Sequence, residues 1–155
     1  MNLPSPEALN NFIVRAKAAT YAGSGAHSLS YRPGSMDLQF QDGAFAYLDS
    51  YFGGSDFLGQ EVVYYTNQPV WVMNYYRYIL RPDKISGTDA GRVIKASLSQ
   101  LYKEGRFLGG FEHRVDNYFY VDTNAGDISR FTGKEWIADQ DLRVYELVYH
   151  GGLVK

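Results

Sequence analysis

The sequence predicts an α+β fold in which one unit, a helix followed by an antiparallel meander of three or four strands, occurs twice. Three observations support this prediction. Each half begins with a helix signal, each helix is followed by a two-residue hairpin signal, and a pattern of aromatic and acidic residues recurs in the second half. We place the copies at about residues 5–80 and 88–155 of a single compact domain, 1–155. Two such copies can bury their faces against each other, which predicts a pseudo-two-fold relationship.

The helix signals are local and specific. Ser5 as an N-cap, proline at the first helical position and Glu7 in the first turn are typical of a helix start, and apolar residues follow at helical spacing to about residue 21. The second helix is predicted to begin near Asp89. Its apolar positions recur on one face until Gly105, a residue type that commonly ends a helix in the left-handed conformation.

Short turns predict the strands that follow each helix. Asp42-Gly43 and Asp116-Asn117 each separate two extended-looking stretches, which is the two-residue signal of a β-hairpin. Residues 24–35 and 81–88 lack periodicity and carry Gly, Pro and Ser, so we expect loops there, the second joining the halves.

The repeat itself is clearest in the predicted strands. Three pairs of segments match: FAYLD (45–49) with YFYVD (118–122), FLGQE (57–61) with FTGKE (131–135), and WVMNY (71–75) with YELVY (145–149). The offset is 73 from Asp49 to Asp122 and 74 from Glu61 to Glu135, so one residue is added in the loop between the matched segments. Self-similarity at a long, nearly constant offset indicates a repeated supersecondary unit.

Alternation along these strands predicts a candidate ligand site. It places aromatic rings around a carboxylate on one face of each half. We expect Glu61 and Glu135 to be charged anchors in a cavity between helices and sheet, or between the halves. The predicted walls are Tyr47, Trp71, Tyr75, Tyr120, Tyr145 and Tyr149. Such an enclosure favours a flat or amphipathic cation, because each well-placed ring contributes about 0.5–2 kcal/mol of cation–π attraction.

A structural role for the same residues is the competing interpretation. Each Gly-x-Glu could begin a strand, where Gly permits a bulge and Glu accepts hydrogen bonds from a Tyr hydroxyl or a backbone amide. Asp49 and Asp122 precede loops that contain glycine, so we interpret them as turn caps. A catalytic carboxylate pair would need a separation of roughly 5–9.5 Å, which the sequence does not fix.

Composition argues against several other classes of function. The chain has no cysteine and a formal charge of −2, with basic residues scattered along it, so neither a thiolate site nor a nucleic-acid-binding stripe is expected. The three histidines lack metal-ligand spacing, and the Gly-Gly pairs lack the context of a phosphate loop. We predict no metal, no cofactor and no catalytic residues. Without a signal peptide or an apolar membrane span, a cytoplasmic location is expected.

Several short patterns resemble a bacterial family that is classified as a domain of unknown function. They are Tyr47-x-Asp49, Gly53-Gly54, Phe57-x-Gly59-x-Glu61-Val62-Val63, Trp71-x-Met73-Asn74-Tyr75-Tyr76 and Tyr149-His150-Gly151-Gly152. The resemblance covers residues 12–154. Members occur alone or fused behind helix-turn-helix regulators, which implies a sensory or ligand-binding role. Where the family pattern has Gly after the paired tyrosines, this chain has Arg77, a possible cation for a carboxylate such as Glu61. The resemblance implies no catalytic residues.

These observations lead to three ranked hypotheses. The first is a non-enzymatic small-molecule-binding or sensor domain with an aromatic, carboxylate-lined pocket. The second is a protein-interaction module, as a homodimer or with a regulatory protein, because exposed Tyr and Trp are typical interface anchors. The third is an enzyme that uses a carboxylate pair. Neither nucleic acid nor a membrane is an expected partner.

Overall fold

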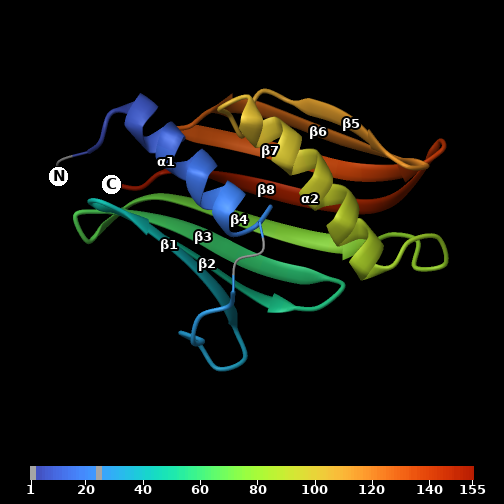
Figure 1. Ribbon diagram of the computed structural model, residues 1–155, viewed down its shortest axis with the longest axis horizontal. Helices are drawn as coiled ribbons and strands as arrows, with labels where there is room; N and C mark the ends of the chain where they lie inside the picture. The colour runs from blue at the N-terminus through green and yellow to red at the C-terminus, as the bar shows by residue number, and fades with distance from the viewer. Residues whose placement is uncertain (1–2, 24–25) are drawn as a thin grey trace.

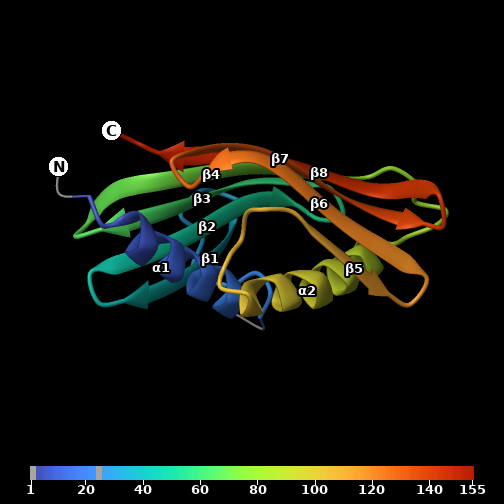
Figure 2. The same cartoon turned by 90° about the horizontal axis from the view of Figure 1, so that it is seen from above.

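The two helices cover one face of a single eight-stranded antiparallel sheet (Figures 1 and 2). The computed structural model describes residues 3–23 and 26–155 of the protein. Its order of elements is one helix and four strands, then a second helix and four more strands. The predicted α+β class and single compact domain are therefore confirmed, with four strands after each helix.

The first helix, α1 (Pro6–Ala19), begins where the sequence predicts. The Ser5 hydroxyl accepts a hydrogen bond from the Ala8 amide at 3.2 Å, and so satisfies one of the amides that a helix start leaves unpaired. The helix ends at Thr20, whose amide donates to the Ala16 carbonyl. Residues 24 and 25 of the loop expected at 24–35 lie outside the described residues.

The second helix is α2 (Gly87–Lys103). We predicted that it begins near Asp89, and it begins two residues earlier. The cap is Ser86, whose hydroxyl accepts from the Asp89 amide at 3.0 Å. The loop expected at 81–88 is shorter for the same reason. At the other end Gly105 has φ +73°, so the predicted left-handed residue after the helix is confirmed.

Both predicted hairpins are present in the sheet. Its strands are β1 (Met36–Asp42), β2 (Phe45–Gly53), β3 (Phe57–Tyr65), β4 (Gln68–Ile79), β5 (Phe111–Val115), β6 (Tyr118–Asp127), β7 (Arg130–Asp139) and β8 (Leu142–Leu153). The turn between β1 and β2 is Gly43-Ala44, one residue later than the predicted Asp42-Gly43, and the turn between β5 and β6 is Asp116-Asn117, as predicted. Gly43 and Asp116 both have positive φ, as tight hairpins require.

The last strands of the two meanders meet in the middle of the sheet. The strand order is β1-β2-β3-β4-β8-β7-β6-β5, so β4 and β8 pair with each other and β1 and β5 form the edges. Tyr75 and Tyr149 face each other in the register of this central pair. The two halves therefore share one continuous sheet, and a site beneath its centre draws residues from both.

The core lies between the helices and the sheet. Six of its fully buried side chains, from both helices and from three strands, are Phe12, Ile13, Trp71, Val93, Tyr120 and Tyr145. Aromatic rings therefore make up much of the surface that the sheet turns toward the helices. In the described part of the chain, no helix is long and apolar enough to cross a membrane.

Candidate functional site

A cavity of about 50 Å³ lies between the two helices and the centre of the sheet. Three of its lining residues are acidic, namely Glu61, Asp122 and Glu135, and one, Lys17, is basic. The tyrosines that line it are Tyr21, Tyr75, Tyr102, Tyr120 and Tyr149. One water needs about 10–15 Å³ of such space, so the cavity admits a few water-sized groups.

Strand register brings four carboxylates together in two pairs. Asp49 on β2 faces Glu61 on β3, and Asp122 on β6 faces Glu135 on β7. All four residues are at most 5% exposed, because alternation along each strand directs them toward the helices. Like charges directly opposite each other destabilise a sheet, so each pair needs a proton, a cation or hydrogen-bond donors.

A tyrosine hydroxyl donates to each of the two aspartates in a matching way. The Tyr75 hydroxyl donates to Asp49 at 2.6 Å, and the Tyr149 hydroxyl donates to Asp122 at 2.7 Å. Our interpretation of these aspartates as turn caps is wrong. Both lie inside strands that continue beyond them, β2 to Gly53 and β6 to Asp127, and both face the core.

The glycines of the Phe-x-Gly-x-Glu pattern make room for these two tyrosines. A Cβ atom on Gly59 would lie 2.4 Å from the Tyr75 hydroxyl oxygen, and one on Gly133 would lie 2.0 Å from a ring carbon of Tyr149. The predicted bulge at each glycine is wrong, since strand pairing continues through both residues and shifts only further along each strand. The glycines therefore permit the tyrosine-to-aspartate hydrogen bonds.

The two glutamates are satisfied in different ways. Glu61 forms a buried ion pair with Lys17 at 2.6 Å, and the Lys17 ammonium lies 5.5 Å from the centroid of the Phe107 ring. Glu135 accepts hydrogen bonds from the hydroxyls of Tyr120 and Tyr145. Among the described residues, neither Glu135 nor Asp122 has a lysine, arginine or histidine within ion-pair distance.

Burial raises the pKa of three of these carboxyl groups. The pKa of Glu135 rises to about 7, and the hydrogen bond from Tyr120 opposes that rise. The pKa of Asp122 rises to about 6 for the same reason, opposed by Tyr149. Burial and the neighbouring Glu61 together raise the pKa of Asp49 to about 7. Near neutral pH Glu135 and Asp49 are therefore partly protonated, and an approaching cation would displace these protons.

Five of the eight predicted site residues line the cavity, namely Glu61, Glu135, Tyr75, Tyr120 and Tyr149. The other three, Tyr47, Trp71 and Tyr145, are buried beside it. Tyr145 still contributes a hydrogen bond to Glu135. Trp71 instead donates its indole N–H to the Ile128 carbonyl, and the hydroxyl of Tyr47 has no hydrogen-bond partner within the described part of the chain.

Sequence reasoning missed Lys17 and misplaced Arg77. Lys17 follows Ile13 at helical spacing on the buried face of α1, so its position was a usable signal for a buried cation. The suggested pairing of Arg77 with Glu61 is wrong. Glu61 pairs with Lys17, and Arg77 donates to the Gly87 carbonyl at 2.7 Å.

The carboxylate pairs meet one condition of the enzyme hypothesis, since each Glu lies beside an Asp and burial raises the pKa in both pairs. Each of the four carboxylates, however, is engaged through at least one oxygen by a tyrosine hydroxyl or by Lys17. The arrangement is better suited to holding a cation than to activating a nucleophile.

A family model described as a domain of unknown function, DUF5680, matches residues 49–154. The chain belongs to the DUF5680 family. The predicted resemblance to a domain of unknown function is thereby confirmed. The DUF5680 match contains all four carboxylates of the two facing pairs, whereas α1 and Lys17 precede it. No curated protein and no solved structure matches the chain significantly.

Proposed function

We propose that this DUF5680 protein is a non-enzymatic small-molecule-binding domain whose ligand places a cationic group in the cavity between the helices and the sheet. The observation that carries the proposal is the contrast between the two carboxylate pairs. Glu61 has an ammonium at ion-pair distance, from Lys17, whereas neither Asp122 nor Glu135 has a cation at that distance within the described residues.

Lys17 supports the proposal as an internal example of a bound ammonium. Its charge meets the carboxylate of Glu61 and the face of the Phe107 ring, which are the two attractions predicted for an external cation. Burying a charge is costly unless it is paired and hydrogen-bonded. A cavity that retains one buried ammonium therefore has the chemistry to retain another.

The second helix has an apolar residue where the first has its lysine. Leu98 lies twelve residues after Ser86, the N-cap of α2, and Lys17 lies twelve residues after Ser5, the N-cap of α1. Leu98 also lines the cavity. The second carboxylate pair thus faces an apolar side chain and three hydrogen-bonding tyrosines, an environment suited to an ammonium group with a short alkyl chain.

Internal duplication would explain this correspondence, and we propose it as the origin of the fold. Each unit has the same order of elements and a tyrosine-to-aspartate hydrogen bond. In each unit a glycine on the neighbouring strand leaves the space that this tyrosine side chain occupies. Gly53 and Gly126 add a further match, because both have positive φ and a Cβ on either would meet a backbone carbonyl oxygen, at 2.2 and 2.1 Å. The two sites would then be divergent copies of one site.

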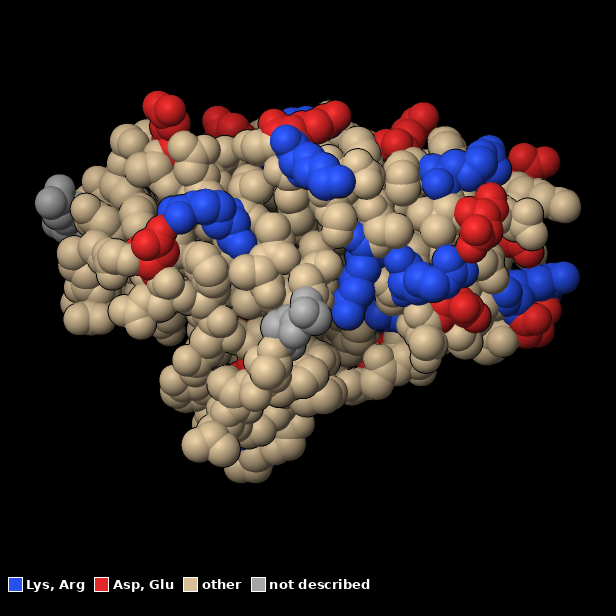
Figure 3. Space-filling view, in the orientation of Figure 1, with Lys and Arg blue, Asp and Glu red and all other residues tan. Residues whose placement is uncertain are grey.

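A sensory role in the cytoplasm completes the proposal. It rests on the resemblance to domains fused behind helix-turn-helix regulators. On the helix-bearing face, basic and acidic side chains are interspersed, which fits a small ligand better than a nucleic-acid backbone (Figure 3).

The test is thermal unfolding with small ammonium ions. The probes are ammonium, methylammonium and ethylammonium chloride, with potassium chloride and the matching alcohols as controls for ionic strength and apolar contact. Methylammonium is expected to raise Tm in the wild type and in Glu112→Gln, which changes an exposed carboxylate, and to have no effect on Glu135→Gln. Equal shifts with potassium, or a shift that persists in Glu135→Gln, would refute a cation site at this carboxylate. No shift, together with strong destabilisation of Glu135→Gln, would assign the glutamate a structural role.

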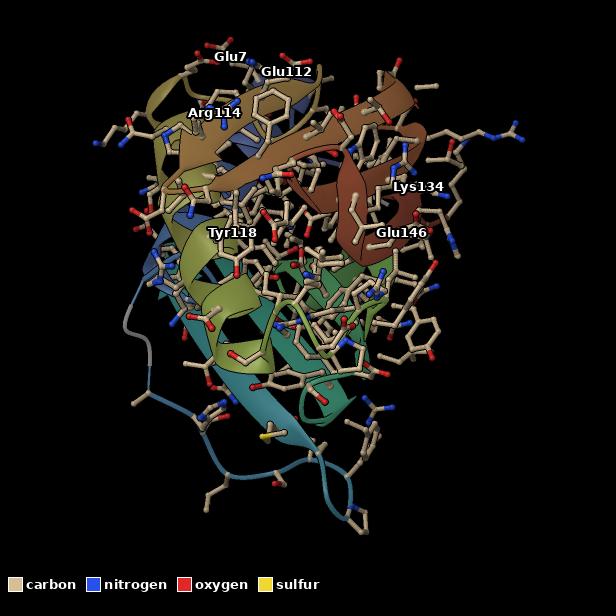
Figure 4. The ribbon with its side chains drawn as sticks, turned by 90° about the vertical axis from the view of Figure 1, so that its right-hand side faces the viewer. Glu7, Glu112, Arg114, Tyr118, Lys134 and Glu146 are labelled. Atoms are coloured by element: carbon tan, nitrogen blue, oxygen red, sulfur yellow. The ribbon has the colours of Figure 1, made fainter. Side chains whose placement is uncertain are left out.

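A row of apolar side chains on the opposite face favours protein interaction as the second candidate function. Leu58, Tyr76 and Val148 are cross-strand neighbours on β3, β4 and β8, and they are 56%, 44% and 36% exposed. The row meets a polar area on β7 and β8, where Lys134 and Glu146 lie side by side at 3.1 Å (Figure 4). Sedimentation should show a concentration-dependent dimer that Leu58→Glu abolishes, and a monomer at all concentrations would count against this role.

A further inference from the structure

A second, larger space opens beside the cavity. It is a cleft of about 300 Å³, at the lower end of the roughly 300–1,000 Å³ typical of ligand pockets. Asp49, Arg77, Tyr51 and Ile94 are among its lining residues. Tyr21 and Tyr75 line both the cleft and the cavity, and so separate the two spaces.

Two buried polar atoms without partners line this cleft. In the described part of the chain, three buried side-chain polar atoms lack a hydrogen-bond partner, and two of them are Oδ2 of Asp49 and Nε of Arg77. The residues are 1% and 6% exposed. Buried polar atoms are nearly always hydrogen-bonded in native proteins, so an unpaired acceptor and an unpaired donor in one cleft call for an explanation.

The surroundings of Arg77 fix its guanidinium and leave it without an anion. The guanidinium carbon lies 4.7 Å from the centroid of the Phe57 ring and 5.3 Å from that of Tyr145. One terminal nitrogen donates to the Gly87 carbonyl. No carboxylate of the described residues lies within 4.0 Å of its nitrogens. A guanidinium held this way can offer Nε–H and a further N–H to a ligand carboxylate.

Asp49 offers the opposite half of a complementary site. Its Oδ1 accepts from Tyr75, and its Oδ2 is the unpaired oxygen. A protonated amine has N–H groups to donate to that oxygen and a charge to pair with the carboxylate.

From these observations we propose that the cleft binds a small zwitterion, with its ammonium at Asp49 and its carboxylate at Arg77. The ligand class is an amino acid or a short ω-amino acid. This site requires a negative as well as a positive group, and it uses neither Asp122 nor Glu135. It therefore stands independently of the cation site proposed for the cavity.

The test is calorimetric titration of the full chain with glycine, β-alanine, 4-aminobutanoate and 6-aminohexanoate, in which the charge separation grows stepwise. Butylammonium and butanoate, each with one charge, are the matched controls. One zwitterion is expected to bind at least tenfold more tightly than either control. Asp49→Asn and Arg77→Met should each weaken it at least tenfold, and Glu135→Gln should leave its affinity unchanged.

Three results would overturn the proposal. They are no binding by any zwitterion of the series, binding of butanoate as tight as that of the best zwitterion, and an affinity unaffected by both Asp49→Asn and Arg77→Met. The comparison of zwitterion with single-charge controls uses the wild type alone, so it decides the question even if Arg77→Met does not fold. Loss of ammonium binding in the cavity with retained zwitterion binding would refute only the proposed function.

Discussion

Asp122 and Glu135 face each other across β6 and β7, both at most 5% exposed and neither with a basic partner among the described residues. Burial raises the pKa of Asp122 to about 6 and that of Glu135 to about 7, well above the values of 3.8 and 4.5 that these groups have in an open chain. The folded protein therefore binds more protons than the unfolded chain between about pH 4 and pH 7.

This proton uptake predicts that the free energy of unfolding falls as pH rises through that window. The contribution of Glu135 is fully present below pH 4.5 and is lost by about pH 7. At about 1.4 kcal/mol per pKa unit, it amounts to roughly 3 kcal/mol. Urea unfolding from pH 4.5 to 8 should give a shallower pH dependence for Glu135→Gln than for the wild type. Glu112→Gln should follow the wild type, and equal slopes for all three proteins would contradict the prediction.

The elements of the fold were predictable because their signals are local. Ser5 caps α1 through its own hydroxyl, and Asp116-Asn117 forms a turn through its own backbone, so neither depends on distant residues. The start of α2 was predicted two residues too late, although its cap, Ser86, is a local signal of the same kind as Ser5. The pairing of β4 with β8 could not be derived, since it depends on how the two halves meet.

The candidate site was only partly predictable, because its details depend on contacts between strands. Alternation was enough to turn Glu61 and Glu135 toward the helices. Asp49 was misinterpreted because its true partner, Tyr75, is two strands away and 26 residues later. The role of Gly133 is likewise set by the ring of Tyr149 on the next strand, which no local pattern reveals.

The glycines beneath the tyrosines give the second prediction. Gly133→Ala places a methyl group 2.0 Å from a ring carbon of Tyr149, so the ring must move and its hydrogen bond to Asp122 is lost. Overpacking of this kind costs about 1–3 kcal/mol. The control is Gly91→Ala in α2, where the added methyl meets nothing within 4 Å and should stabilise the helix by about 0.5–1 kcal/mol. Urea unfolding measures both, and a neutral Gly133→Ala would contradict the packing argument.

The buried ion pair gives the third prediction. Lys17→Met removes the partner of Glu61 and leaves its carboxylate buried and unpaired, which costs about 3–5 kcal/mol at pH 8. The double variant Lys17→Met, Glu61→Gln removes both charges and should recover much of that loss. A double-mutant cycle by urea unfolding separates the coupling from the single effects. Additive losses would show that the 2.6 Å pair contributes nothing beyond its separate groups.

The fourth prediction converts the second carboxylate pair into a copy of the first. Leu98→Lys places an amine at the α2 position that matches Lys17, in the same cavity as Glu135. Paired with that glutamate, the new ammonium holds it ionised, so the fall in stability between pH 4.5 and pH 7 should shrink. It also occupies the space proposed for an external cation, so methylammonium should no longer raise Tm. Leu98→Met, which keeps a long apolar side chain, should behave like the wild type in both measurements.

Two outcomes would contradict the prediction. If Leu98→Lys still responds to methylammonium as the wild type does, the cation binds elsewhere. If instead its pH dependence is unchanged, the two helix positions are not equivalent, because the new amine does not reach Glu135.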